Sequence, residues 1–237
     1  MKIFAVDTCC MAATAAVMDD CRLVAETVVN HRKTHSQKMM PQIEAILSQA
    51  EVDISDIDYF AAAVGPGSFT GVRIGVATVK SMAQAAGKEC VAVSTLEALA
   101  NASRVFPGIL CPILDARRDQ VYNALFSGGE SFLRLCPDRA LALSDLLDEL
   151  EKRPEPVLFM GDGTLVYREE IATRLGRRAQ FAQRMLNMNL ASSVCEVAFE
   201  KVQQGEVLPY GELVPAYVRL SQAERDLKKK MENGVEK

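Results

Sequence analysis

The sequence predicts an α/β protein of two related lobes, in which mixed β-sheets are flanked by helices. The chain opens with three short apolar runs separated by turn residues, a pattern typical of a β-meander. A similar opening recurs from residue 109, where an apolar run, a polar turn and a second apolar run follow one another. Alternating helix and strand patterns follow each opening, so we expect two units of similar organisation.

Composition narrows the class of protein. The chain has 237 residues, of which 49% are hydrophobic and 24% charged, the balance of a folded globular protein. No apolar run approaches the ~20 residues that cross a bilayer, and residues 1–7 read as a strand rather than a signal peptide, so we expect no membrane association. The net charge of −4 argues against a protein that binds nucleic acid without a partner protein. Seven cysteines without a C-x-x-C pair indicate a reduced, cytoplasmic protein.

The elements of the first half follow from their periodicity. Strands are expected at residues 3–7, 12–18, 22–29, 59–64 and 90–93, and helices at 36–50, 70–86 and 95–102. The first helix shows one broad apolar face, with Pro41 in its first turn, where a missing N–H costs little. The second carries apolar or small side chains on two faces, so it should be buried on more than one side. Ser94 is placed to cap the third.

The second half repeats the scheme. Strands are expected at 109–114, 121–126 and 157–160, and helices at 143–151, 166–175 and 190–203. Residues 115–120 form the hairpin turn, and Ser144 opens the first of these helices. The predicted boundaries are residues 1–103 for an N-terminal lobe, 104–220 for a smaller C-terminal lobe, and 221–237 for a polar, disordered tail. Two such lobes correspond to an actin-like architecture, with a nucleotide cleft expected between them.

A glycine-rich stretch from Gly65 to Gly75 is the most informative motif. Thr70 breaks the spacing of a dinucleotide-binding loop, and no Gly-Lys-Ser/Thr closes the stretch as a P-loop. Pro66 and Thr70 stand where a serine nucleophile elbow at Ser68 would need glycines. Two interpretations remain: backbone N–H groups at a helix N-terminus that suit an anion, or glycines that serve a tight turn and close helix packing.

Several motifs stand in order along nearly the whole chain. They are Asp7-Thr8-Cys9, the stretch 65–75, Leu114-Asp115-Ala116-Arg117 with Val121-Tyr122, Gly161-Asp162-Gly163, and Val214-Pro215-Ala216-Tyr217-Val218-Arg219. Together they resemble the bacterial TsaB (YeaZ) family. The resemblance implies the two-lobed actin-like ATPase (ASKHA, ribonuclease H-like) fold.

The same resemblance implies a function. Family members serve in the threonylcarbamoyl modification of the adenosine beside the anticodon of tRNAs that read codons starting with A. They are non-catalytic partners of a paralogue, TsaD, which performs the transfer, and they work with the ATPase TsaE. The resemblance implies a homodimer when the partner is absent, contact with tRNA only through the complex, and no required cofactor. Whether ATP or ADP binds at the cleft or at the partner interface stays open.

The histidines give only a weak metal signal. His31 and His35 stand four apart, as zinc ligands on a helix often do, but no third ligand stands out nearby. In the catalytic paralogue the resemblance places the metal-binding H-x-x-x-H just after the strand that follows the glycine-rich helix. Here that position holds Thr95 and Leu99. A hydroxyl and an isobutyl group cannot replace two imidazoles, so we expect no metal site and no glycoprotease activity.

Acids and glycines at the hairpin turns are the candidate nucleotide ligands. Asp7 and Asp115 occupy the turns of the two predicted hairpins, where carboxylates could position metal-bound water. In actin-like ATPases the equivalent acids face the phosphates from opposite lobes. The candidate set is Asp7, Thr8, Asp115, Gly161 and Gly163, interpreted as a vestigial nucleotide cleft. Turn formation and capping remain the alternative role for these residues.

A candidate partner interface lies on the first two predicted helices. The resemblance implies that family members use these helices to form a helical bundle with a second copy or with the catalytic paralogue. The predicted contact residues are Met39, Met40, Ile43, Ile46, Leu47, Val72, Val76, Val79, Met82 and Ala83. Methionine suits a surface that repacks against different partners. The alternative is that both helices are internal.

Three functions therefore compete. A scaffold subunit that activates TsaD leads, because no residues form a convincing catalytic set. An independent actin-like ATPase or small-molecule kinase is the second. A metallo-glycoprotease is the third, and the residues at 95 and 99 argue against it.

Overall fold

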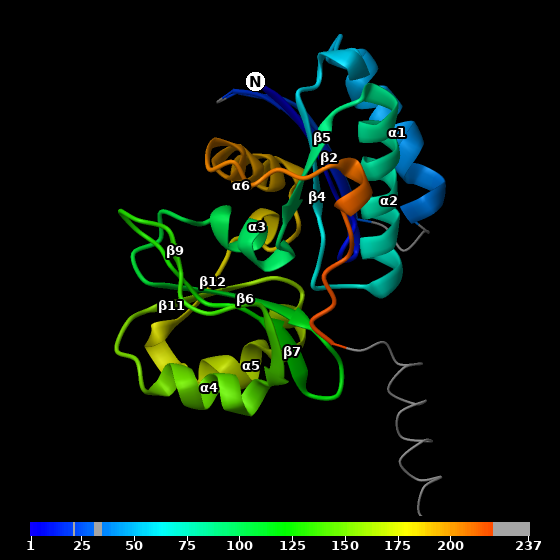
Figure 1. The fold of residues 1–237 in the computed structure, drawn as a ribbon. Coiled ribbons are helices and arrows are strands. Elements are labelled where there is room, and N and C mark those ends of the chain that lie inside the picture. The colour runs from blue at the N-terminus through cyan, green and yellow to red at the C-terminus, as the bar shows by residue number, and fades with distance from the viewer. Residues whose placement is uncertain (21, 31–34, 220–237) are drawn as a thin grey trace, which may run out of the picture.

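The computed structural model describes residues 1–20, 22–30 and 35–219. His31 and the tail expected from residue 221 lie outside the described residues, as does the side chain of His35. The described chain forms two lobes, one above the other in Figure 1.

The first lobe is built on a five-stranded sheet. Its strands are β1 (Lys2–Asp7), β2 (Ala12–Asp19), β3 (Arg22–Asn30), β4 (Tyr59–Ala63) and β5 (Glu89–Val93), in the order β3-β2-β1-β4-β5. The meander β1-β2-β3 is antiparallel, whereas β1, β4 and β5 run parallel. The parallel strands are nearly all buried, because helices cover both faces of the sheet.

Two layers of helices enclose this sheet. Helices α1 (His35–Gln49) and α2 (Phe69–Ala86) lie side by side on one face, and α6 (Ala191–Gln203) crosses the other (Figure 1). The core between the layers holds residues such as Phe4, Phe60 and Val79, each fully shielded from solvent.

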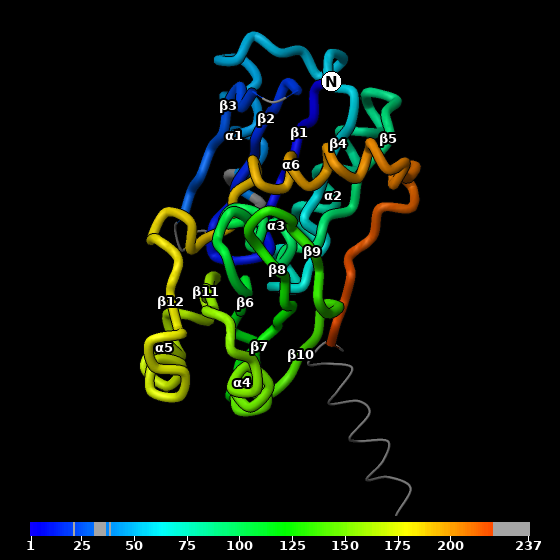
Figure 2. Tube along the Cα trace, turned by 90° about the vertical axis from the view of Figure 1, so that its left-hand side faces the viewer, coloured from blue at the N-terminus to red at the C-terminus, as the bar shows by residue number. Residues whose placement is uncertain are grey.

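The second lobe repeats the topology of the first. Its main strands are β6 (Ile109–Asp115), β7 (Gln120–Asn123), β10 (Arg139–Ala142), β11 (Val157–Met160) and β12 (Ala179–Phe181), in the order β10-β7-β6-β11-β12. If the main strands of each lobe are numbered 1 to 5 along the chain, both sheets have the order 3-2-1-4-5. The short strands β8 (Phe126–Ser127) and β9 (Leu133–Arg134) pair beside β6. Helices α4 (Leu143–Glu151) and α5 (Gly163–Leu175) cover the face away from the first lobe (Figure 2).

Helix α3 (Thr95–Asn101) lies between the lobes and packs against elements of both, α6 of the first and β6 of the second. Leu96 and Leu99 pack with Leu110 and Phe126 of the second lobe in a separate buried cluster. The hydroxyl of Ser94 accepts a bond from the N–H of Glu97, which confirms the predicted cap.

Four expectations are corrected by the structure. The helix with Pro41 starts at His35, so the proline lies in its second turn; burial of Met39 and Ile43 opposes the cost of a proline there. Helix α4 has the expected bounds, Leu143–Glu151, but Ser144 does not open it: Ala142 is the N-cap, without a side-chain bond, because strand β10 leads straight into the helix.

The expected strand 121–126 is divided between β7 and β8. Asn123 causes the break, because its side-chain amide donates to the carbonyls of Pro112 and Ala124. The boundary 104–220 also needs revision. After β12 the chain returns to the first lobe, where α6 packs its apolar face, including Val194 and Ala198, on that lobe's sheet.

Candidate functional site

The tip of the β1-β2 hairpin packs directly against the start of α2. The hydroxyl of Thr8 donates to the carbonyl of Gly71 at 2.6 Å, and the N–H of Ser68 donates to the carbonyl of Cys9 at 2.7 Å. A Cβ atom at Gly67 would overlap the Cys9 carbonyl, and one at Gly71 would overlap the Thr8 carbonyl. The glycines of this turn are therefore needed for close backbone packing between the hairpin and the helix.

This packing decides between the two interpretations of the glycine-rich stretch. The N–H groups of Ser68, Gly71 and Val72 all donate to acceptors inside the chain. The hairpin tip facing them has neither the glycines nor the basic side chains with which a phosphate is usually held. The turn thus fits helix packing rather than an anion.

Asp7 is buried at the end of β1. It is 1% exposed, and its Oδ1 accepts a hydrogen bond from the N–H of Cys9 at 2.8 Å. The Cys9 thiol donates to the carbonyl of Ala63 at 3.3 Å. Burial raises the pKa of this thiol well above its usual value, and the charge of Asp7 raises it further. The site therefore contains an inert thiol beside a capping carboxylate.

The acid of the second hairpin has a different environment. Asp115 is exposed, its Oδ1 accepts from the N–H of Arg117 at 2.8 Å, and it lies 3.3 Å from the hydroxyl of Tyr167. Burial and the neighbouring charge of Asp115 raise the pKa of Tyr167 to about 12. The backbone N–H of Asp115 donates to Asp162 at 3.0 Å. Burial raises the pKa of Asp162, and repulsion from Asp115 adds to that rise.

Gly161 and Gly163 support this hairpin from α5. Gly161 has φ +96°, and its N–H donates to the side chain of Asn187 at 2.8 Å. A Cβ at Gly163 would lie 3.0 Å from the carbonyl oxygen of Ile113, so the start of α5 approaches β6 closely. These glycines, like those of the first lobe, allow a helix to approach a strand.

Cys10, at the tip of the first hairpin, packs against the buried cluster that contains Leu114 and Tyr122 of the second hairpin. Burial raises the pKa of the Cys10 thiol, and the charges of Asp162 from one lobe and Asp7 from the other add to the effect. The structure therefore gathers the predicted Asp7, Thr8 and Asp115 around the join between the lobes. It adds Asp162 and Tyr167, which carried no motif signal beyond the Gly-Asp-Gly turn.

The position implied for metal ligands is buried. Thr95 and Leu99 are 0% and 2% exposed within helix α3. A hydroxyl and an aliphatic side chain do not form a metal-binding donor set. Over the ranges that the structure describes, no group of three or more His, Cys, Asp or Glu side chains is arranged to hold a metal ion. Over the same ranges, no helix combines the length and apolar character needed to cross a bilayer.

The predicted interface residues divide into two groups. Eight of them are buried inside the first lobe, where they form the contact of α1 and α2 with the sheet: Met39, Ile43, Ile46, Val72, Val76, Val79, Met82 and Ala83. Met40 is 53% exposed and Leu47 is partly exposed. As outward contacts seven of the eight are therefore corrected, because the apolar stripe that periodicity detects is the one facing the sheet; Met82 is buried too but also lines the outward groove.

The outward sides of α1 and α2 still form an apolar groove. It has a volume of about 510 Å³ and is lined by Met40, Ile54, Ala77, Thr78, Ser81, Met82 and Ala85. Ala77, Ser81 and Ala85 recur every fourth residue of α2, so they share one side of the helix. Small side chains on one side allow another helix to approach closely.

Comparison with known sequences gives a consistent family. Residues 23–227 match the family model for TsaD, described as a tRNA N6-adenosine threonylcarbamoyltransferase. The tRNA threonylcarbamoyladenosine biosynthesis protein TsaB of Bacillus subtilis (strain 168) is 34% identical over 225 residues, covering 94% of this chain and 96% of that protein. The TsaB of Escherichia coli (strain K12) is 34% identical over 138 residues, covering 55% of this chain and 57% of that protein.

Solved structures agree with the sequence matches. The structure of YeaZ from Pseudomonas aeruginosa is similar with a TM-score of 0.74 at 26% identity, covering 91% of this chain and 99% of that one. A ROK hexokinase from Thermus thermophilus is similar with a TM-score of 0.52 at 13% identity, covering 85% of this chain and 100% of that one. The second likeness shows the fold alone, the two-lobed actin-like fold expected from the sequence.

Proposed function

The chain belongs to the TsaB (YeaZ) family, and we propose on that premise that it is a non-catalytic subunit in tRNA threonylcarbamoyladenosine biosynthesis. Its part is to bind a TsaD transferase through the outward sides of α1 and α2. The match of residues 23–227 to the TsaD model supports a common fold for the two proteins, which suits pairing between similar surfaces.

One observation carries the proposal: the groove between α1 and α2 is apolar and open. Its floor is formed by small side chains of α2, and Met40 stands at its edge with 53% of its surface exposed. An apolar surface of this kind is unfavourable in water and is stabilised when a partner covers it. A helix pair from TsaD would complete a four-helix contact here, and a second copy of this chain would do so when TsaD is absent.

The site around the hairpins supports a role without chemistry. The Cys9 thiol is held protonated by burial, and Asp7 caps a backbone N–H inside the protein. The glycine-rich turn is committed to packing. We therefore propose that the chain stabilises the active conformation of TsaD, with TsaE and tRNA acting through the complex in the cytoplasm.

A single substitution tests the docking surface. Ala77→Glu places a charge in the groove without touching the core, since Ala77 is exposed. It should weaken the affinity for the TsaD of the same organism at least tenfold, measured by calorimetry, because an unpaired charge would be buried on binding. Ala172→Glu, on the exposed side of α5 in the other lobe, is the matched control and should change the affinity less than twofold.

The binding results distinguish the proposed function from the proposed docking surface. Absence of a complex between the parent chain and TsaD would overturn the proposed function. Equal binding by Ala77→Glu and the parent would place the surface elsewhere. Val79→Glu is unsuitable for this test, because Val79 is 0% exposed and the charge would unfold the lobe.

The role without chemistry has its own test. Hydrolysis of ATP and the threonylcarbamoyl transfer to tRNA should both be undetectable with this chain alone, and the transfer should appear only when TsaD and TsaE are added. Turnover of ATP by the isolated chain would instead support the independent ATPase or small-molecule kinase.

A further inference from the structure

The last described residues, 213–219, leave the first lobe and reach the second without forming a helix or strand. In Figure 1 and Figure 2 this orange-red segment runs down one side of the molecule, past α2, to the level of the second lobe. It bridges the two lobes.

The upper end of the segment is firmly held by the first lobe. Leu213 is 1% exposed and belongs to the core of that lobe. The N–H of Ala216 donates to the carbonyl of Val64 at 2.8 Å. The carbonyl oxygen of Ala216 lies 2.8 Å from where a Cβ of Gly65 would be, so the segment and the glycine-rich turn approach backbone to backbone.

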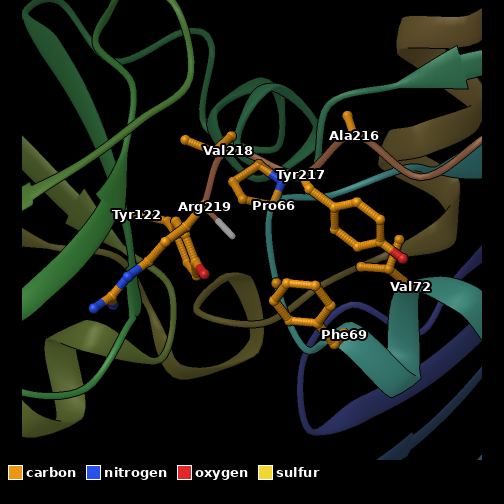
Figure 3. A pocket seen from close by; sticks show the side chains of 9 residues that line it. Pro66, Phe69, Val72, Tyr122, Ala216, Tyr217, Val218 and Arg219 are labelled. Carbon is orange, nitrogen blue, oxygen red and sulfur yellow. The ribbon is translucent and has the colours of Figure 1, made fainter. Parts of the chain in front are cut away.

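Tyr217 attaches the segment to the first turn of α2. Its ring stacks on Phe69, with centroids 4.7 Å apart and planes 13° from parallel. Its hydroxyl accepts a hydrogen bond from Nε of Arg73 at 2.6 Å. Figure 3 shows the rings of Tyr217 and Phe69 next to each other, with Pro66 to one side. Both contacts of Tyr217 therefore belong to the first lobe.

The lower end contacts the second lobe. Val218 packs against the buried cluster that joins α3 to that lobe, and Nη1 of Arg219 donates to the carbonyl of Ala116 at 3.1 Å. Ala116 begins the tip of the β6-β7 hairpin, directly after Asp115. The space enclosed with Tyr122 and Pro66 is about 10 Å³, room for one water molecule at most, so the contact is closed rather than a ligand site (Figure 3).

We propose that residues 213–219 form an interlobe latch, with Tyr217 as its contact on the first lobe and Arg219 as its contact on the second. Three residues beyond Ala216 can span at most about 11 Å, so the segment has little slack. A rotation of the lobes about α3 that separates α2 from the second hairpin must break one of these contacts. The latch therefore holds the Asp115 hairpin at a set position relative to the Asp7 hairpin.

Hydrogen exchange in the purified full chain tests the latch. Tyr217→Ala should speed exchange of the Ala116 and Gln120 amides at least threefold, although Tyr217 contacts only the first lobe. Both amides donate within the hairpin tip, to the carbonyls of Gln120 and Arg117, so they report on its order. Arg219→Ala should have an effect of similar size, and amides in the middle of α1 and α4 should stay at their parent rates.

Matched variants make the result specific. Tyr217→Phe keeps the stack on Phe69 and loses the bond from Arg73, so its rates should fall between those of the parent and of Tyr217→Ala. Tyr210→Ala removes an exposed tyrosine in the short 3-10 turn Tyr210–Glu212, which precedes the latch, and should leave the hairpin rates unchanged. Parent rates at Ala116 and Gln120 in Tyr217→Ala, or equal acceleration by Tyr210→Ala, would overturn the latch. Because no partner is added, the result is independent of the docking experiment.

Discussion

The two lobes share one strand order, yet their first hairpins meet the join between the lobes in opposite ways. The β1-β2 tip is buried against α2. Asp7 is 1% exposed, and the backbone carbonyls of Thr8 and Cys9 contact the glycines of the turn. The β6-β7 tip is exposed, and Arg117, Arg118 and Asp119 all have φ between +56° and +62°. One tip is therefore stabilised by tertiary packing, whereas the other carries unfavourable left-handed backbone.

The contrast shows that a repeated topology preserves the sheets and leaves the tips free to differ. In both lobes the first strand is central and fully covered, so its apolar pattern is set by burial. The tips lie beyond the sheets, where contacts from other elements decide their conformation. In the first lobe α2 supplies those contacts, and in the second Arg219 supplies one. Four experiments test this contrast.

The largest effect is expected at Gly71. Gly71→Ala should lower the free energy of unfolding by about 3 kcal/mol, because its Cβ would overlap the Thr8 carbonyl and neither backbone can move freely. Gly163→Ala, at the corresponding place in the second lobe, should cost about 1 kcal/mol, since a shift of a few tenths of an ångström relieves its contact. Urea unfolding measures both. Gly211→Ala, with open space around it, is the control, and equal losses at Gly71 and Gly163 would remove the contrast.

The second largest effect is expected in the loss of stability on replacing Asp7 compared with Asp115. Asp7→Ala should destabilise by about 2 kcal/mol, because the N–H of the buried Cys9 loses its acceptor. Asp115→Ala should cost less than about 0.5 kcal/mol, because water can replace an exposed carboxylate. Thermal unfolding checks the pair, and Asp7→Asn, which keeps an acceptor oxygen, should recover most of the loss. A larger loss at Asp115 than at Asp7 would contradict the assignment of the buried tip.

The strained backbone predicts a stabilising change. Arg118→Gly should raise the free energy of unfolding by about 1 kcal/mol, because glycine adopts φ near +56° without the clash of a Cβ. Arg177→Gly is the control; Arg177 is exposed and lies outside the positive-φ residues, so glycine there should be neutral or destabilising. Both are measured by urea unfolding. Destabilisation by Arg118→Gly would mean that the arginine side chain holds the tip in place.

The smallest effect concerns pH. The raised pKa of Asp162 means that the folded chain favours the protonated carboxyl, so its contribution to stability is complete below the unfolded value of about 4. That contribution is lost as pH rises through the raised folded value. Asp162→Asn, which stays neutral, should therefore exceed the parent in stability at pH 7 by less than about 1 kcal/mol and match it near pH 3. Urea unfolding of both proteins from pH 3 to pH 7 measures this difference, and Glu170→Gln is the control for removing a negative charge. An equal stability of Asp162→Asn and the parent at every pH would contradict the prediction.

Periodicity alone recovered most elements, because burial imposes a pattern on each strand and helix. The parallel strands β4 and β11 are short apolar runs since both faces are covered. The expectation that α2 is buried on more than one side is wrong: its buried residues form one face, and Ala77, Ser81 and Ala85 on the other are exposed. The repeat of the meander predicted the two related lobes. Ser94 was found as a cap because its role depends only on the residues that follow it.

Tertiary structure decided what depends on neighbours distant in the chain. Eight of the ten interface residues chosen by apolar spacing are buried inside the first lobe, since the residues that form a core and those that form a docking surface are chemically alike. The return of α6 to the first lobe and the attachment of residues 213–219 to both lobes involve partners more than 90 residues away. Sequence determines which segments are apolar and how they repeat. The packing of the sheets and helices determines which apolar side of a helix is exposed to water and which glycine contacts another backbone. Sequence alone does not determine this, because close packing is a property of the assembled fold.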